Sequence, residues 1–232
     1  MSKQALKRII SRDIKSIHKN KLNEQGIHIS FNEDNMLEAV AIIIGPKDTI
    51  YENGILYFKI LFPNNYPYSP PKVSYIARNS IRIHPNLYTG TAKDNYLGKV
   101  CISLLNTWSG PQWTSIMDIS SIMLSIISLL DNNPLKHEPG FDKVFTNNHK
   151  LYSEAVLYEK NRTLIVKNIF DIPNEFSCFT DIINNHYNKN KTAIVNDLNQ
   201  KIKSKYNNSI IDINIYRINI KLSYDYIIKN II

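Results

Sequence analysis

The stretch HPNLYTGTAKDNYLGKVCISLLNTWSGPQW, residues 84–113, decides the interpretation of this chain. Asn86 carries an amide that can donate hydrogen bonds, and Cys101 follows it between apolar side chains. A cysteine near a fixed amide favours thiol nucleophile chemistry over a disulfide. The alternative is a buried structural cysteine, which would be favoured for a cysteine taken at random. The rest of the chain decides between the two.

Composition places the chain among ordinary globular proteins. Its 232 residues suffice for one domain and an appendage, and 43% of them are hydrophobic. We find neither a run of eighteen apolar residues nor the apolar core of a secretory signal, so we expect no membrane span and no leader. With only two cysteines, Cys101 and Cys178, a disulfide framework is not expected. We therefore expect a reducing compartment, the cytoplasm, the nucleus or both.

The formal net charge of +8 favours acidic partners. The basic residues are scattered among Asn, Ile and Tyr, and the sequence has no zinc-finger or RNA-recognition signature. A basic nucleic-acid-binding protein is therefore a weak alternative.

The hydrophobic pattern predicts an α+β fold. Apolar residues spaced by three and four over 4–20 predict an amphipathic helix with a basic outer face. Four β-rich runs follow, joined by short turns that favour an antiparallel meander, and we place them at residues 28–31, 37–44, 55–62 and 72–76. A proline-rich loop lies at 66–71, and a mostly buried helix is predicted over 115–130. We expect several helices between 148 and 230, with breaks near Pro173 and residues 207–209.

The order of these motifs resembles the ubiquitin-conjugating enzymes. The matching pieces are FPNNYPYSPPKV (62–73), HPN (84–86), GKVC (98–101) and QW (112–113). VCISLLNTWSG (100–110) and HEPGFD (137–142) are most similar to the large Z-type members and to the conjugating domain fused to an inhibitor-of-apoptosis protein. The resemblance implies the family's core fold over residues 1–165, with an N-terminal helix, the meander, an active-site loop and a long central helix. Residues 166–232 would form a helical C-terminal extension.

The resemblance also implies a chemistry. Cys101 would take ubiquitin or a ubiquitin-like modifier from an activating enzyme as a thioester, and a substrate lysine would then attack it, usually with a ligase. Asn86 would stabilise the oxyanion, hold the loop over Cys101, or do both. Glu138 would position or deprotonate the attacking amine, and Ser103 stands where many members carry an acid. No metal or cofactor is expected, since the partner activating enzyme uses the ATP.

The remaining candidate residues are assigned by the same resemblance. His84, Pro85 and Trp113 are expected to be structural. The basic face of the N-terminal helix would bind the activating enzyme. The proline-rich loop and the loop that contains Trp108 and Pro111 would bind a ligase. These expected partner-binding residues are Lys7, Arg8, Arg12, Lys15, Tyr66, Pro67, Pro70, Trp108 and Pro111. Residues 89–95 are interpreted as a loop insertion. A catalytically silent ubiquitin-binding scaffold of the same fold is the other alternative.

Overall fold

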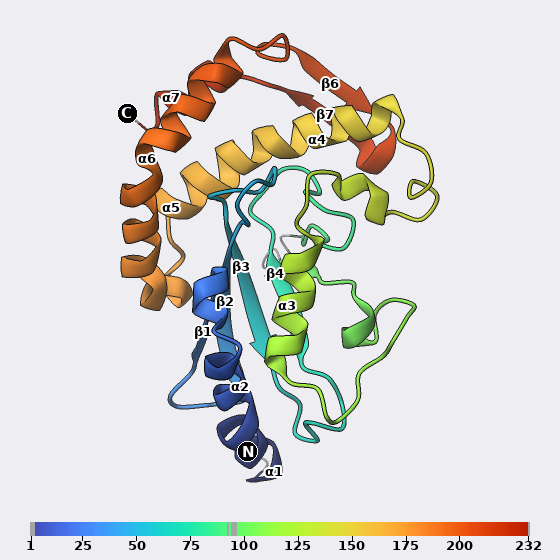
Figure 1. The fold of residues 1–232 in the computed structure, drawn as a ribbon, viewed down its shortest axis with the longest axis vertical. Coiled ribbons are helices and arrows are strands. Elements are labelled where there is room, and N and C mark those ends of the chain that lie inside the picture. The colour runs from blue at the N-terminus through green and yellow to red at the C-terminus, as the bar shows by residue number, and fades with distance from the viewer. Residues whose placement is uncertain (1–2, 92, 94–96, 232) are drawn as a thin grey trace. The chain divides into compact units, whose positions relative to one another are not determined.

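The computed structural model describes residues 3–91, 93 and 97–231. The chain forms two compact units, each built from several segments (Figure 1). The first contains Met1–Ile44, Leu56–Ala77 and Asn86–Leu129, and the second contains Gly45–Ile55, Arg78–Pro85 and Leu130–Ile232.

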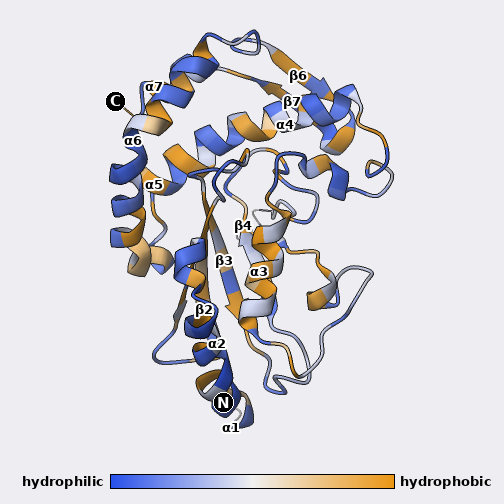
Figure 2. Ribbon diagram, in the orientation of Figure 1, coloured by the Kyte–Doolittle hydropathy of each residue, from blue (hydrophilic) through white to orange (hydrophobic). Residues whose placement is uncertain are grey.

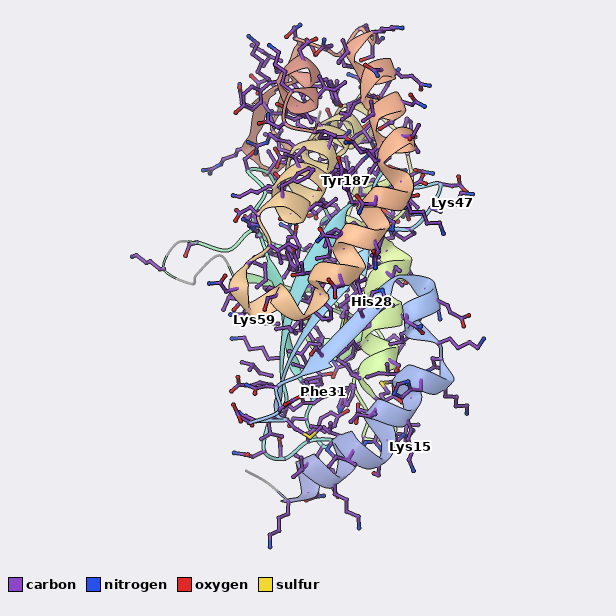
Figure 3. The ribbon with its side chains drawn as sticks, turned by 90° about the vertical axis from the view of Figure 1, so that its left-hand side faces the viewer. Lys15, His28, Phe31, Lys47, Lys59 and Tyr187 are labelled. Carbon is purple, nitrogen blue, oxygen red and sulfur yellow. The ribbon has the colours of Figure 1, made fainter. Side chains whose placement is uncertain are left out.

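The first unit begins with one helical run. It consists of α1 (Lys3–Arg8), a π-helical turn (Ile9–Asp13) and α2 (Ile14–Lys19), and a 3-10 turn (Leu22–Gln25) follows. Ala5 and Ile9 are fully buried, whereas Lys15 is exposed (Figure 3). The amphipathic helix predicted for residues 4–20 is confirmed.

A five-stranded sheet follows, in the order β1-β2-β3-β4-β5. The strands are β1 (Ile27–Phe31), β2 (Glu38–Ile44), β3 (Ile55–Leu61), β4 (Lys72–Ile76) and β5 (Leu97–Lys99). The strand pairs β1–β2, β3–β4 and β4–β5 are antiparallel, with Ile29 opposite Ala41 and Tyr75 opposite Gly98. The predicted four-stranded meander is confirmed, and β5 adds a short fifth strand that the sequence analysis did not identify.

Helix α3 (Ile119–Leu129) is the long central helix of this unit, and it is mostly apolar (Figure 2). Ile119, Ile122 and Ile126 are completely buried. The helix begins later than the predicted residue 115 because the Asp118 carboxylate accepts a hydrogen bond from the Ser121 N–H at 3.2 Å, as an N-cap does.

The second unit is mainly helical. After a 3-10 turn (Pro134–His137), its helical segments are α4 (Asn147–Glu159), a π-helical stretch (Lys160–Lys167), α5 (Asn168–Phe170), a 3-10 segment (Asn174–Phe179), α6 (Thr180–Ile202) and α7 (Tyr224–Ile228). The breaks predicted near Pro173 and residues 207–209 are both present. The helical run 147–170 crosses the proposed domain boundary after residue 165, and that boundary stays a prediction.

The prediction that the C-terminal extension, residues 166–232, is helical is wrong for one segment. Strands β6 (Ile210–Ile213) and β7 (Ile218–Lys221) form an antiparallel hairpin there. The side chains of β6 alternate between exposed and buried, which is the period of a strand. The sequence analysis missed this strand because only four residues alternate and the segments around them have helical spacing.

Among the described residues, we find no helix with the length and apolar character needed to cross a bilayer.

Candidate functional site

The segment that carries Cys101, which follows β5, is held against the segment that carries Asn86. The Cys101 N–H donates to the Asn86 carbonyl at 2.9 Å, and the Tyr88 N–H donates to the Lys99 carbonyl at 3.0 Å. Gly98 permits this close approach, because a Cβ at its position would lie 1.8 Å from the Tyr88 carbonyl oxygen. The GKVC pattern therefore places Cys101 beside the asparagine, as the sequence analysis expected.

The Asn86 side chain reinforces the same contact. Its Nδ2 donates a hydrogen bond to the Cys101 carbonyl oxygen at 2.6 Å, and the residue is 7% exposed. The amide is therefore bound to the backbone of the candidate nucleophile, which is the geometry of the loop-holding role.

The Cys101 thiol lies under a short loop. The residue is 2% exposed, and its Sγ donates to the Thr107 carbonyl at 2.8 Å. The Thr107 hydroxyl accepts from the Ile102 N–H and also contacts the carbonyls of Val100 and Ile102, each at 3.0 Å. Sequence reasoning missed Thr107, although it lies within the quoted motif. This loop must move before the sulfur can attack an external carbonyl.

A cleft of about 560 Å³ lies beside this loop. Val100, Leu105 and Thr107 line it together with Lys72 and Lys99. The covered thiol is therefore next to open space.

His84 and Pro85 belong to the second unit, where they have structural contacts. His84 is fully buried, with its ring centroid 6.4 Å from that of Tyr51 and 5.0 Å from that of His137. The Pro85 carbonyl accepts a hydrogen bond from Arg82.

Tyr66 corrects one expectation. Its side chain is fully buried, so the prediction that it forms part of a docking surface is wrong. Its hydroxyl donates to Asp13 at 2.6 Å, and its ring packs against Phe62 and Trp113 at centroid distances of 4.9 and 5.9 Å. Tyr66 therefore anchors the proline-rich loop from inside.

Asp13 is a buried structural position that sequence reasoning missed. One carboxylate oxygen accepts from Tyr66 and from the Ile119 N–H, which joins the N-terminal helical run, the proline-rich loop and α3. Burial raises the pKa of Asp13 despite these hydrogen bonds and the nearby Arg8 guanidinium. The sequence did contain a signal for a buried acid, because Asp13 lies four residues after Ile9 and so on the apolar face of the predicted N-terminal helix.

Four of the other expected partner residues line hollows in the surface. Lys7, Arg8 and Pro67 line one hollow of about 300 Å³ with the exposed Tyr68. Pro70 lines the cleft near Cys101 instead.

Trp108 and Pro111 are exposed, as are Lys7, Arg12 and Lys15. Arg8 and Arg12 also donate to the carbonyls of Met117 and Ile116, so part of the predicted docking surface holds the first unit together.

The two tryptophans have different environments. Trp113 is 8% exposed, its Nε1 donates to the Pro67 carbonyl at 2.7 Å, and its backbone N–H donates to Asn106 Oδ1 at 3.0 Å. Trp108 is 39% exposed. The Trp113 indole thus holds the proline-rich loop through a hydrogen bond, while Trp108 can contact a partner at the surface.

Glu138 lies in the second unit, just after the 3-10 turn Pro134–His137. Its half-buried carboxylate accepts a hydrogen bond from the Tyr216 hydroxyl. The predicted insertion 89–95 falls partly outside the described residues, because residues 92, 94 and 95 are not among them. Within the described residues, no cluster of His, Cys, Asp and Glu could hold a metal ion.

Comparison with known proteins gives the family. The family model "Ubiquitin-conjugating enzyme" matches residues 9–166, which is more than half of the chain. The chain therefore belongs to the ubiquitin-conjugating enzyme family.

The chain is similar to Z-type members of that family. It is 38% identical over 167 residues to "Ubiquitin-conjugating enzyme E2 Z" of Danio rerio, covering 71% of this chain and 48% of that protein. The Homo sapiens protein of the same name is 38% identical over 159 residues, covering 67% of this chain and 42% of that protein. A "Ubiquitin-conjugating enzyme E2" of African swine fever virus is 36% identical over 138 residues, covering 57% and 58%. The expected likeness to the Z-type branch is confirmed, and the chain spans about half the length of the curated relatives it matches.

Proposed function

We propose that this chain accepts ubiquitin or a ubiquitin-like modifier as a thioester on Cys101 and transfers it to a lysine amine. The observation that carries the proposal is the hydrogen bond from Asn86 Nδ2 to the Cys101 carbonyl. It fixes a thiol nucleophile and an amide donor side by side, which is the arrangement acyl transfer needs.

The reaction has two acyl transfers. In the first, the Cys101 thiolate attacks the thioester carbon on the activating enzyme, a new carbon–sulfur bond forms, and the enzyme's thiolate leaves. In the second, a lysine nitrogen attacks that carbon, the carbon–nitrogen bond forms, and Cys101 leaves as thiolate while the amine gives its proton to Glu138 or to water. ATP is consumed by the activating enzyme, and we propose no cofactor for this chain.

The first transfer requires the Cys101 loop to open. Opening breaks the hydrogen bond from Sγ to the Thr107 carbonyl and uncovers a side chain that is 2% exposed. The adjacent cleft provides room for this movement. We infer that binding of the ubiquitin-loaded activating enzyme supplies the free energy needed to open the Cys101 loop.

Asn86 has two successive roles in this scheme. At rest its amide holds the Cys101 backbone. When negative charge develops on the thioester oxygen, the same amide can stabilise it, and one such donor is worth about 3 kcal/mol. Glu138 is proposed to position the lysine amine.

The partners follow from the charges and surfaces. The exposed Lys7, Arg12 and Lys15 would steer an acidic activating enzyme toward the N-terminal helix. The half-buried Pro67 and the exposed Tyr68, Trp108 and Pro111 offer proline and aromatic groups for contact with a ligase. Thiol chemistry of this kind requires a reducing compartment, so we propose the cytoplasm or the nucleus.

A charging assay tests the proposal. The chain is incubated with activating enzyme, ATP and ubiquitin, and a thiol-sensitive adduct is sought on a gel. The burial of Cys101 favours one other candidate, a ubiquitin-binding scaffold of the same fold. The scaffold would bind ubiquitin without an adduct to any modifier, whereas the proposed enzyme forms the adduct.

A further inference from the structure

The hairpin β6–β7 ends in a turn with unusual backbone geometry. Between its strands lies the 3-10 turn Ile215–Arg217, in which Tyr216 has φ 55° and ψ 16° and Arg217 has φ 53°. Neither residue is glycine, and a left-handed backbone is unfavourable for a residue with a side chain. Such a turn persists where the side chains it presents make compensating contacts.

Tyr216 makes those contacts. Its hydroxyl donates to Glu138 Oε2, and the Arg82 guanidinium lies 4.5 Å from its ring centroid. The Tyr152 ring lies 5.7 Å away, and the Tyr152 hydroxyl donates to the Arg82 carbonyl at 2.8 Å. Arg82 in turn donates to the carbonyl of Pro85. One side chain of the C-terminal hairpin thus connects the Glu138 loop to the segment that leads into the HPN motif.

We infer that Tyr216 is a positioning residue that holds the Glu138 carboxylate in place for the attacking amine. The inference rests on the proposed function. The Glu138 backbone is held by hydrogen bonds to Leu135 and Phe141, and the contact with Tyr216 orients its side chain. The Tyr216 hydroxyl donates directly to this carboxylate.

The geometry explains why a hydroxyl suits this task. The Tyr216 hydroxyl donates to Oε2, and the attacking amine would donate to the other carboxylate oxygen, Oε1. A tyrosine hydroxyl is neutral at physiological pH, so it orients the carboxylate without neutralising its charge. An arginine or lysine at the same place would instead compete with the substrate amine.

The test separates amine transfer from the other steps. The full chain is charged with ubiquitin, the activating enzyme is quenched, and loss of the thioester is followed with free lysine or with free cysteine as acceptor. Cysteine attacks as a thiolate and needs no carboxylate to take a proton from an amine. We expect Tyr216→Phe to slow discharge to lysine about tenfold, as loss of a supporting residue does. Charging and discharge to cysteine should stay at the wild-type rate.

Two further variants make the result specific. Glu138→Gln should slow lysine discharge at least as much, and adding Tyr216→Phe to it should have no further effect, because both act through one carboxylate. Raising the pH from about 7 to about 9 should reduce the difference in lysine-discharge rate between the wild type and these variants, since more of the free amine is then deprotonated. Tyr226→Phe, at an exposed tyrosine of α7, is the matched control and should behave as wild type.

Several outcomes would overturn the inference. Faster lysine discharge in Tyr216→Phe would mean that the hairpin masks Glu138. An equal loss with lysine and cysteine would mean that Tyr216 merely supports the fold. An unaffected Glu138→Gln would remove the role of the carboxylate while leaving the thioester on Cys101 intact. Failure of the wild type to charge would instead defeat the proposed function itself.

Discussion

Asn86 Nδ2 donates a hydrogen bond to the backbone carbonyl oxygen of Cys101 across 2.6 Å. The backbone adds a second bond in the opposite sense, from the Cys101 N–H to the Asn86 carbonyl at 2.9 Å. The asparagine is therefore part of the support of the nucleophile before any substrate arrives. Substituting it should affect both stability and chemistry, and the two effects can be measured apart.

Asn86→Ala should lower the free energy of unfolding by about 1–2 kcal/mol, because the buried Cys101 carbonyl loses its donor. Charging should persist, and discharge to lysine should fall about 100-fold if the amide also stabilises the oxyanion. Urea unfolding and single-turnover discharge provide the two measurements.

Asn168→Ala is the matched control for this variant. Asn168 is also buried, and its Nδ2 donates to the Ile55 carbonyl at 2.7 Å, far along the chain from Cys101. It should lose similar stability with discharge unchanged. If Asn86→Ala slowed charging and discharge equally, the asparagine would only hold the loop.

Thr107→Val should loosen the loop over Cys101, because the variant keeps the shape of the side chain and removes its contacts with the 100–102 backbone. We expect Cys101 to react several-fold faster with iodoacetamide, as followed by site-resolved mass spectrometry. In the wild type the exposed Cys178 should react before Cys101. The control is Thr163→Val, which removes a buried hydroxyl bonded to Glu159. An unchanged Cys101 rate in Thr107→Val would show that this hydroxyl does not keep the loop closed.

Asp13→Asn should change the pH dependence of stability. Burial raises the folded-state pKa of Asp13 above its ordinary value of 3.8, so the folded protein keeps this proton to a higher pH than the unfolded chain does. The stability from this group is full below the unfolded pKa and is lost as the pH rises through the folded pKa. The wild type should therefore lose stability relative to Asp13→Asn as the pH is raised above about 4, as measured by urea unfolding. A constant difference over that range would contradict the assignment.

Lys7→Glu combined with Lys15→Glu should slow charging by about 3–10-fold at low salt, because the exposed basic face would no longer attract an acidic activating enzyme. The defect should shrink at high salt, where the charges are screened. Lys47→Glu is the control for charge, since it removes an exposed lysine of the second unit (Figure 3). Equal slowing by the control would indicate that net charge, rather than this helix face, matters.

Much of the fold could be predicted because local patterns carry it. β-Branched and aromatic runs marked β1 to β4 to within a residue or so, and spacing by three and four marked the N-terminal run. The C-terminal hairpin was missed because four residues per strand give a weak signal among helical segments.

The site was predictable only in part. Cys101 and Asn86 could be paired through the motifs that contain them. The burial of Tyr66 could not be predicted, because it depends on Asp13, which lies 53 positions away. The contact between Tyr216 and Glu138 spans 78 positions and has no local pattern. Side-chain partners of this kind are set by tertiary packing rather than by spacing along the chain.

The most direct test of the account compares the two cysteines in one charging assay. With activating enzyme, ATP and ubiquitin, and with a second modifier in parallel, wild type and Cys178→Ala should form a thiol-sensitive adduct, and Cys101→Ala should form none. Because Cys178 is exposed and Cys101 is buried, indiscriminate thiol reactivity would give the opposite selectivity. An adduct that survives Cys101→Ala and disappears in Cys178→Ala, or the absence of any adduct from the wild type, would contradict the proposed acyl transfer.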